Sequence, residues 1–159
     1  MTDDRSAAAI VGAALRDSRY AVLATESGGQ PHASLMAFVP ERGGRELLFA
    51  TYRDTRKHRN LVANPRVALF IDHCEAPALR TAPRQGLTAL GRATVVPAAE
   101  AASARDALFA HHPDLADFLV HEDCVLVRLA VEWYQVTGGI DDVGWCRADA
   151  LADAPADGA

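Results

Sequence analysis

Hydrophobic and polar positions follow two different periods in the first fifty residues. Between residues 5 and 17 the apolar side chains recur at i, i+3 and i+4, which predicts an amphipathic helix with one buried stripe. From residue 20 the apolar positions alternate instead, and segments rich in glycine and proline at 27–31 and 40–44 interrupt the alternation. We therefore expect an antiparallel meander of three strands, at residues 20–26, 32–39 and 46–51.

The middle of the chain changes pattern again. Residues 54–64 hold good helix formers, with Asp54 as the expected N-cap and Pro65 after the end, so we predict a short helix there. Residues 67–72 are apolar at successive positions, which is typical of a strand covered on both faces. Residues 74–83 contain two prolines and no period, which predicts a loop.

Two further strands and more helix are expected in the second half. The strand at 87–96 contains Gly91, which indicates a bulge or a close approach of another backbone segment. Residues 97–111 are rich in alanine and predict a helix, and residues 114–120 predict one or two more helical turns. The longest alternation runs over 125–134 and predicts the last strand.

The order of these elements excludes a parallel α/β sheet, because the strands and helices do not alternate as βαβ units do. The best fit is a mainly β fold with helical insertions, in which an antiparallel barrel closes and leaves few edge strands. A length of 159 residues suits a single domain, which we place at residues 1–147. The Ala- and Asp-rich residues 148–159 are expected to form a disordered tail.

Composition limits the function classes. Hydrophobic residues make up 50% of the chain, but alanine alone supplies about a fifth, so we expect a small core that subunit contacts supplement. A net charge of -5 disfavours a nucleic-acid binder. No apolar run is long enough for a membrane helix and no signal peptide is visible, so we expect a cytoplasmic protein without membrane contact. Three cysteines without Cys-x-x-Cys spacing favour neither disulfides nor a metal site.

The densest chemical feature is the segment RDTRKHRNL at residues 53–61. It carries Arg53, Arg56, Lys57 and Arg59 against one acid, in a chain whose overall charge is negative. At a helix start, free N–H groups and the positive end of the helix dipole favour an anion, and Arg and Lys together suit a phosphate monoester. The alternative interpretation is an exposed basic helix face without a ligand.

Several segments occur in a specific order. Residues 24–39 read ATESGGQPHASLMAFV, and residues 47–72 read LLFATYRDTRKHRNLVANPRVALFID. With this pattern the chain resembles the FMN-binding split-barrel superfamily, which includes pyridoxamine 5′-phosphate oxidase. The later segments LTALGRA, HHPDLADF and VRLAVEWYQVTGG are more similar to its haem-iron-utilisation branch. The resemblance covers most of residues 19–147.

The resemblance implies a six-stranded antiparallel split β-barrel, a homodimer, and FMN held in a cleft between the two subunits. In the superfamily, a Ser/Thr-Arg-Lys sequence at the start of the basic helix binds the flavin phosphate, and the second strand runs beside the ring and the ribityl chain. An Arg-Gln pair reaches the flavin ring, and a late tryptophan covers it. The cofactor-binding residues that this implies are His32, Ala33, Ser34, Leu35, Thr51, Thr55, Arg56, Lys57, Arg84, Gln85 and Trp145.

The resemblance implies an FMN-dependent oxidoreductase that acts on a small molecule near the dimer cleft. The flavin carries the redox step, so no catalytic acid or base has to be visible, and none is assigned. The C-terminal Arg and His with which pyridoxamine phosphate oxidases hold their substrate have no counterpart after Trp145, so we expect another substrate. Two alternatives stay open: a non-catalytic flavin- or haem-binding protein of the haem-utilisation type, and a deazaflavin-binding relative.

Overall fold

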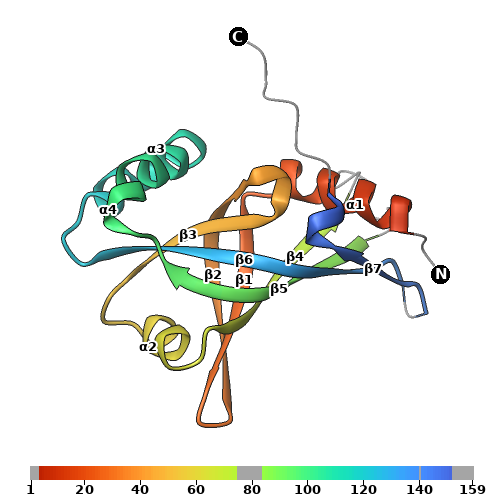
Figure 1. The fold of residues 1–159 in the computed structure, drawn as a ribbon, viewed down its shortest axis with the longest axis horizontal. Helices are drawn as coiled ribbons and strands as arrows, with labels where there is room; N and C mark the ends of the chain where they lie inside the picture. Colours follow the sequence, from red (N-terminus) through yellow and green to blue (C-terminus); the bar gives the residue numbers. More distant parts are fainter. Residues whose placement is uncertain (1–3, 75–83, 140, 152–159) are drawn as a thin grey trace.

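The chain folds into a closed antiparallel barrel. A computed structural model describes residues 4–74, 84–139 and 141–151. Six strands follow the order β3-β2-β1-β4-β5-β6, and β6 pairs with β3 to close the barrel (Figure 1). The strands are β1 (Tyr20–Ser27), β2 (Gln30–Glu41), β3 (Glu46–Tyr52), β4 (Arg66–Cys74), β5 (Arg84–Val95) and β6 (Cys124–Thr137). The predicted six-stranded antiparallel barrel is confirmed.

A seventh strand, β7 (Val143–Arg147), lies outside the barrel. One edge of β6 pairs with β5 over nearly its whole length, whereas the other edge pairs first with β3, over 124–130, and then with β7, over 133–137. The barrel therefore splits at the point where β6 changes partner. The sequence pattern does not predict β7, because its buried positions are occupied by the small residues Gly144 and Cys146.

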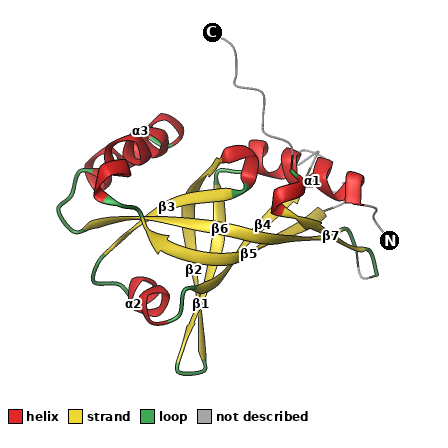
Figure 2. Cartoon of the chain, viewed as in Figure 1, coloured by secondary structure: helices red, strands yellow, loops and turns green. Residues whose placement is uncertain are grey.

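The helices lie around the barrel (Figure 2). They are α1 (Asp4–Asp17), α2 (Arg56–Ala63), α3 (Ala101–His111) and α4 (Ala116–Leu119). The helix α1 contacts β4, β6 and β7 and buries Val11, Ala14 and Leu15, which recur at helical spacing. Short 3-10 turns occur at Arg42–Gly44, Ala98–Glu100 and Pro113–Leu115.

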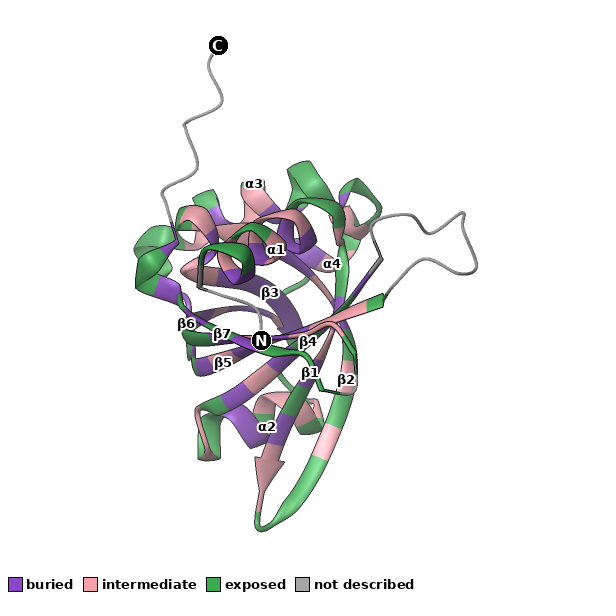
Figure 3. Ribbon diagram, turned by 90° about the vertical axis from the view of Figure 1, so that its right-hand side faces the viewer, coloured by how far each residue is buried: buried purple, intermediate pink, exposed green. Residues whose placement is uncertain are grey.

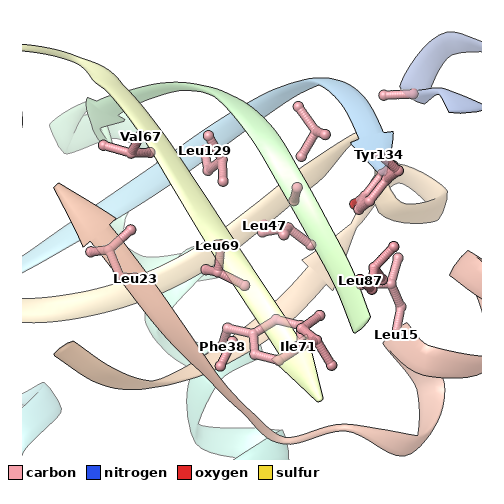
Figure 4. Packing of buried hydrophobic residues seen from close by; sticks show 14 of the residues in the cluster. Leu15, Leu23, Phe38, Leu47, Val67, Leu69, Ile71, Leu87, Leu129 and Tyr134 are labelled. Carbon is pink, nitrogen blue, oxygen red and sulfur yellow. The ribbon is translucent and has the colours of Figure 1, made fainter. Parts of the chain in front are cut away.

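Two separate apolar clusters stabilise the molecule. The larger cluster fills the barrel and includes Leu23, Phe38 and Leu69, whose side chains point inward (Figure 4). The smaller cluster lies between the barrel and α3 and α4, and it includes Leu48 and Leu108. Buried and exposed positions alternate along much of the strands, as one-sided packing requires (Figure 3).

The N-cap of α2 and the start of the C-terminal tail differ from those expected. The N-cap of α2 is Thr55 and not Asp54, because the carboxylate of Asp54 instead pairs with Arg59 at 2.6 Å. The expected disordered tail at 148–159 is wrong for residues 148–151: Ala148–Ala150 forms a 3-10 turn, and Leu151 is buried in the barrel cluster. Residues 152–159 lie outside the described residues, as do residues 75–83 of the expected loop.

Gly91 lies where the partner change on β6 occurs. The register between β5 and β6 shifts between Leu90 and Gly91, so that Glu132 is the extra residue on β6. A Cβ atom at Gly91 would lie 2.0 Å from the carbonyl oxygen of Ala130. The predicted bulge and close backbone approach at Gly91 are therefore both present.

We expect Gly91→Ala to lower the free energy of unfolding by about 2–4 kcal/mol, because β6 has to move away from β5 to admit the methyl group. Urea unfolding followed by circular dichroism measures this loss. Gly139→Ala is the matched control, since nothing lies within 4 Å of a Cβ atom there. Equal stability losses in the two variants would contradict the close approach at Gly91.

Candidate functional site

A hollow of about 320 Å³ lies beside the end of β3, and we call it the β3 pocket. The strands β1, β2 and β3, the start of α2 and the α3–α4 region all contribute to its walls. Its lining is mainly apolar, and its hydroxyl and ammonium groups come mostly from the end of β3 and the start of α2. The lining residues are Tyr20, Leu35, Met36, Ala37, Ala50, Thr51, Tyr52, Thr55, Lys57, Leu108, Leu115 and Phe118.

A hydroxyl network fixes the start of α2 against β3. The Oγ1 atom of Thr55 accepts a hydrogen bond from the His58 N–H group at 3.3 Å, which caps the helix, and donates to the Tyr52 carbonyl oxygen at 2.9 Å. The hydroxyl of Thr51 lies 3.0 Å from that of Thr55. Thr51 and Thr55 therefore hold the backbone at the point where the basic segment enters its helix.

The cations of this segment differ in how they are paired. The guanidinium of Arg59 binds Asp54 at 2.6 Å. Among the described residues, neither Arg56 nor Lys57 has an ion-pair partner. The N–H groups of Arg56 and Lys57 also lack acceptors inside the helix, because they belong to its first turn. The start of α2 therefore presents two side-chain charges and two N–H donors.

The helix α2 is anchored to the barrel by polar contacts and by one buried leucine. The amide of Asn60 donates to Thr25 Oγ1 on β1 at 3.1 Å, and the amide of Asn64 donates to Glu26 at 2.8 Å. Leu61 is buried in the barrel cluster. These contacts hold α2 rigidly, so that its first turn keeps a fixed position beside the β3 pocket.

The outer wall of the β3 pocket comes from the α3–α4 region. The ring of His112 is fully buried, and its Nε2 atom donates to the Phe38 carbonyl oxygen at 3.0 Å. It also packs edge-to-face on Tyr20, with ring centroids 5.7 Å apart. Phe118 packs in the same way on Tyr52, at 4.8 Å. This wall is not predictable from the sequence, because no short motif links β2, β3 and the residues near 108–118.

The structure brings together only some of the residues that the resemblance implies. Leu35, Thr51, Thr55 and Lys57 line the same pocket, with Arg56 directly beside them. The other three residues of the β2 segment, His32, Ala33 and Ser34, follow β2 toward the β1–β2 turn and do not line it. The Ser34 hydroxyl lies 3.2 Å from His32 Nε2.

Arg84, Gln85 and Trp145 lie at the other end of the barrel. Thr51 pairs with Val125 on β6, whereas Gly86, next to Gln85, pairs with Thr137. These two positions on β6 are roughly 40 Å apart along the strand. Within one chain, this second group of residues is therefore remote from the start of α2.

The second group has its own contacts. Arg84 pairs with Asp72, and Trp145, which is 44% exposed, packs edge-to-face on Trp133. The Oε1 atom of Gln85 is buried and has no hydrogen-bond partner among the described residues. This end of the barrel therefore carries both an exposed aromatic surface and an unsatisfied polar atom.

The sequence matches a known family over most of its length. The family model described as pyridoxamine 5′-phosphate oxidase matches residues 9–138. The chain belongs to this family. The comparison with curated proteins gives no match.

Several solved structures of other proteins have a similar fold. A haem-binding protein from Mycobacterium smegmatis has a TM-score of 0.79 and 22% identity, with 91% of this chain and 59% of that chain covered. An FAD-binding protein from Mesorhizobium loti has a TM-score of 0.67 and 18% identity, covering 80% and 91%. HutZ, a haem storage protein from Vibrio cholerae, has a TM-score of 0.66 and 23% identity, covering 78% and 89%.

Two negative findings concern the described part of the chain. Within it, no helix is both long enough and apolar enough to cross a membrane. The same residues contain no group of three or more His, Cys, Asp or Glu side chains that could hold a metal ion.

We expect Thr55→Val to lower the free energy of unfolding by about 1 kcal/mol, because it removes the N-cap of α2 while keeping the side-chain volume. Thermal unfolding measures the change. Thr55→Ser keeps the hydroxyl and should remain within a few tenths of a kcal/mol of the natural protein. If the valine and serine variants unfold alike, the hydroxyl does not cap the helix.

Proposed function

We propose that this protein binds FMN in the β3 pocket and acts as an oxidoreductase on a small molecule. The observation that carries the proposal is the charge of Arg56 and Lys57, neither of which has an ion-pair partner among the described residues, at the first turn of α2 beside an apolar hollow. A cofactor with a terminal phosphate and a flat aromatic ring needs both features together. Bound FMN would supply the redox chemistry itself.

The donor set at the start of α2 fits a phosphate dianion. Arg56 offers a planar fork, Lys57 a point charge, and the first-turn N–H groups additional donors. Because the hydroxyl of Thr55 already donates to the Tyr52 carbonyl, its role in the proposal is to position these groups. Leu35 on β2 would lie against the ring, and the α3–α4 wall would exclude water from it.

The names of two structural neighbours raise haem as an alternative ligand. Haem iron takes histidine, cysteine, methionine or tyrosine as axial ligands. Among the described residues that line the β3 pocket there is no histidine or cysteine, but Tyr20, Met36 and Tyr52 line it. His112 lies behind this wall, and its Nε2 atom is bound to the Phe38 carbonyl. We favour a flavin over haem because Arg56 and Lys57 at the start of α2 suit a terminal phosphate, which FMN has and haem lacks.

The proposal includes a homodimer. A row of residues that are cross-strand partners runs over the outer face of the sheet. It consists of Leu35, Val22, Phe70, Thr88, Gln135 and Trp145, one from each of six neighbouring strands. Leu35 is 72% exposed and Phe70 is 42% exposed, which is an unusually apolar surface for a free sheet face. We propose that a second copy covers this face. Arg84, Gln85 and Trp145 of one copy could then reach the flavin of the other.

The double variant Arg56→Glu/Lys57→Glu should weaken FMN binding by about a hundredfold or more, because it replaces two charge-assisted contacts with repulsion. Quenching of flavin fluorescence during titration of the apoprotein measures the affinity. The visible spectrum of the purified protein also separates flavin from haem, and mass spectrometry of the released cofactor separates FMN from a deazaflavin.

Arg5→Glu/Arg16→Glu on α1 is the matched control, because it reverses two exposed arginines and changes the net charge equally. It should bind FMN like the natural protein. An unchanged affinity in the α2 variant would show that the phosphate lies elsewhere. A natural protein that binds no flavin at all would overturn the proposal, and one that binds flavin without any turnover would leave only the binding function.

Phe70→Asp should convert the dimer to a monomer, because it places a charge at the centre of the proposed interface. Sedimentation equilibrium measures the mass. Phe109→Asp is the control, since Phe109 is similarly exposed (48%) but lies on α3, away from this face. If the natural chain is a monomer, or if only the control dissociates, the proposed interface is wrong.

A further inference from the structure

The basic segment that begins at Arg53 divides between two sides of the molecule. Lys57 lines the β3 pocket, and Arg59 is paired with Asp54. Arg53 and His58 instead line a second hollow of about 160 Å³, which we call the β6 cleft. The two hollows share no lining residue. The proposed flavin site therefore uses only part of the positive charge in this segment.

The β6 cleft lies between α2, α3 and the first residues of β6. Its lining residues are Arg53, His58, Val95, Val96, Ala101, Arg105, Cys124, Val125 and Leu126. The backbone holds Arg53 in place, because its N–H group donates to the Asp123 carbonyl oxygen at 2.9 Å. The Nε atom of Arg105 donates to the Leu119 carbonyl oxygen at 2.8 Å, which fixes that guanidinium at the cleft.

No described carboxylate compensates the charge in this cleft. Neither Arg53 nor Arg105 has an ion-pair partner among the described residues, and no carboxylate occurs among the described residues that line the cleft. Burial raises the pKa of the Cys124 thiol, and the positive charge of Arg105 opposes this shift. The Arg105 charge therefore favours the thiolate form of Cys124. Two guanidinium groups around one small cleft repel each other, and an anion between them would relieve this repulsion.

We propose that the β6 cleft is a second anion site, distinct from the flavin site, which binds a small phosphate monoester through Arg53, Arg105 and His58. Two guanidinium forks and an imidazole N–H are donors that suit a phosphate dianion. The apolar floor formed by Val96 and Leu126 suits the few carbon atoms that a volume of about 160 Å³ admits beside the phosphate. The site requires no flavin.

Cys124 reports on this site in the natural chain. Inorganic phosphate bound in the cleft would cover the thiol and neutralise the charge that favours its thiolate, so alkylation by iodoacetamide should slow by about threefold or more. Peptide-resolved mass spectrometry follows Cys124 alone. Sodium chloride at equal ionic strength is the reference, because it screens charge without binding as a dianion.

Arg53→Gln should abolish the protection by phosphate while leaving FMN affinity unchanged, and Arg105→Gln gives a second test of the same prediction. Arg5→Gln, at an exposed position on α1, is the control and should keep the protection. Equal alkylation rates in phosphate and chloride would overturn the proposal, as would protection that persists in both cleft variants. If FMN protects Cys124 but phosphate does not, and Arg53→Gln abolishes the protection by FMN, the cleft belongs to the flavin site. This result would also overturn the proposal of a second anion site.

Discussion

The close packing of β5 on β6 at Gly91 is the constraint on which the barrel depends. At this position the carbonyl of Ala130 lies where a Cβ atom would be, and Glu132 is displaced from the ladder as a bulge. The bulge bends β6, so that the edge of β6 opposite β5 pairs with β3 before the bulge and with β7 after it. Closure through β3 places Thr51 beside α2, and pairing with β7 places Trp145 at the other end.

Much of the fold follows from the sequence pattern, because the strands alternate and the turns carry glycine and proline. The alternation along residues 125–134 and the glycine within the preceding strand both have the structural roles that the pattern indicates. β7 escapes prediction, because a five-residue strand that buries only Gly144 and Cys146 has no hydrophobic period. The N-cap is misassigned by one residue, since Asp54 and Thr55 are both good caps and the local contacts of Thr55 with Tyr52 and of Asp54 with Arg59 decide between them.

The candidate site was predictable only where its residues are close in sequence. Thr51, Thr55 and Lys57 belong to one segment, and the charge of that segment is visible without a structure. The division of the same segment between the β3 pocket and the β6 cleft depends on where β3 ends and how α2 is anchored by Asn60. Tertiary packing decides which of these basic residues line the β3 pocket and which line the β6 cleft. No periodicity of the sequence encodes this division.

The separation of the two apolar clusters has a consequence for how such a protein can diversify. The wall of the β3 pocket that comes from α3 and α4 packs on the smaller cluster, together with residues of β3 and β6 such as Leu48 and Leu126, whereas the side chains that fill the barrel form the larger cluster. Substitutions in groups that share no contacts act nearly independently on stability. Substitutions of Leu115 and Phe118 should therefore change the shape of the pocket, and with it the molecules that fit, while leaving unchanged the side chains that fill the interior of the barrel.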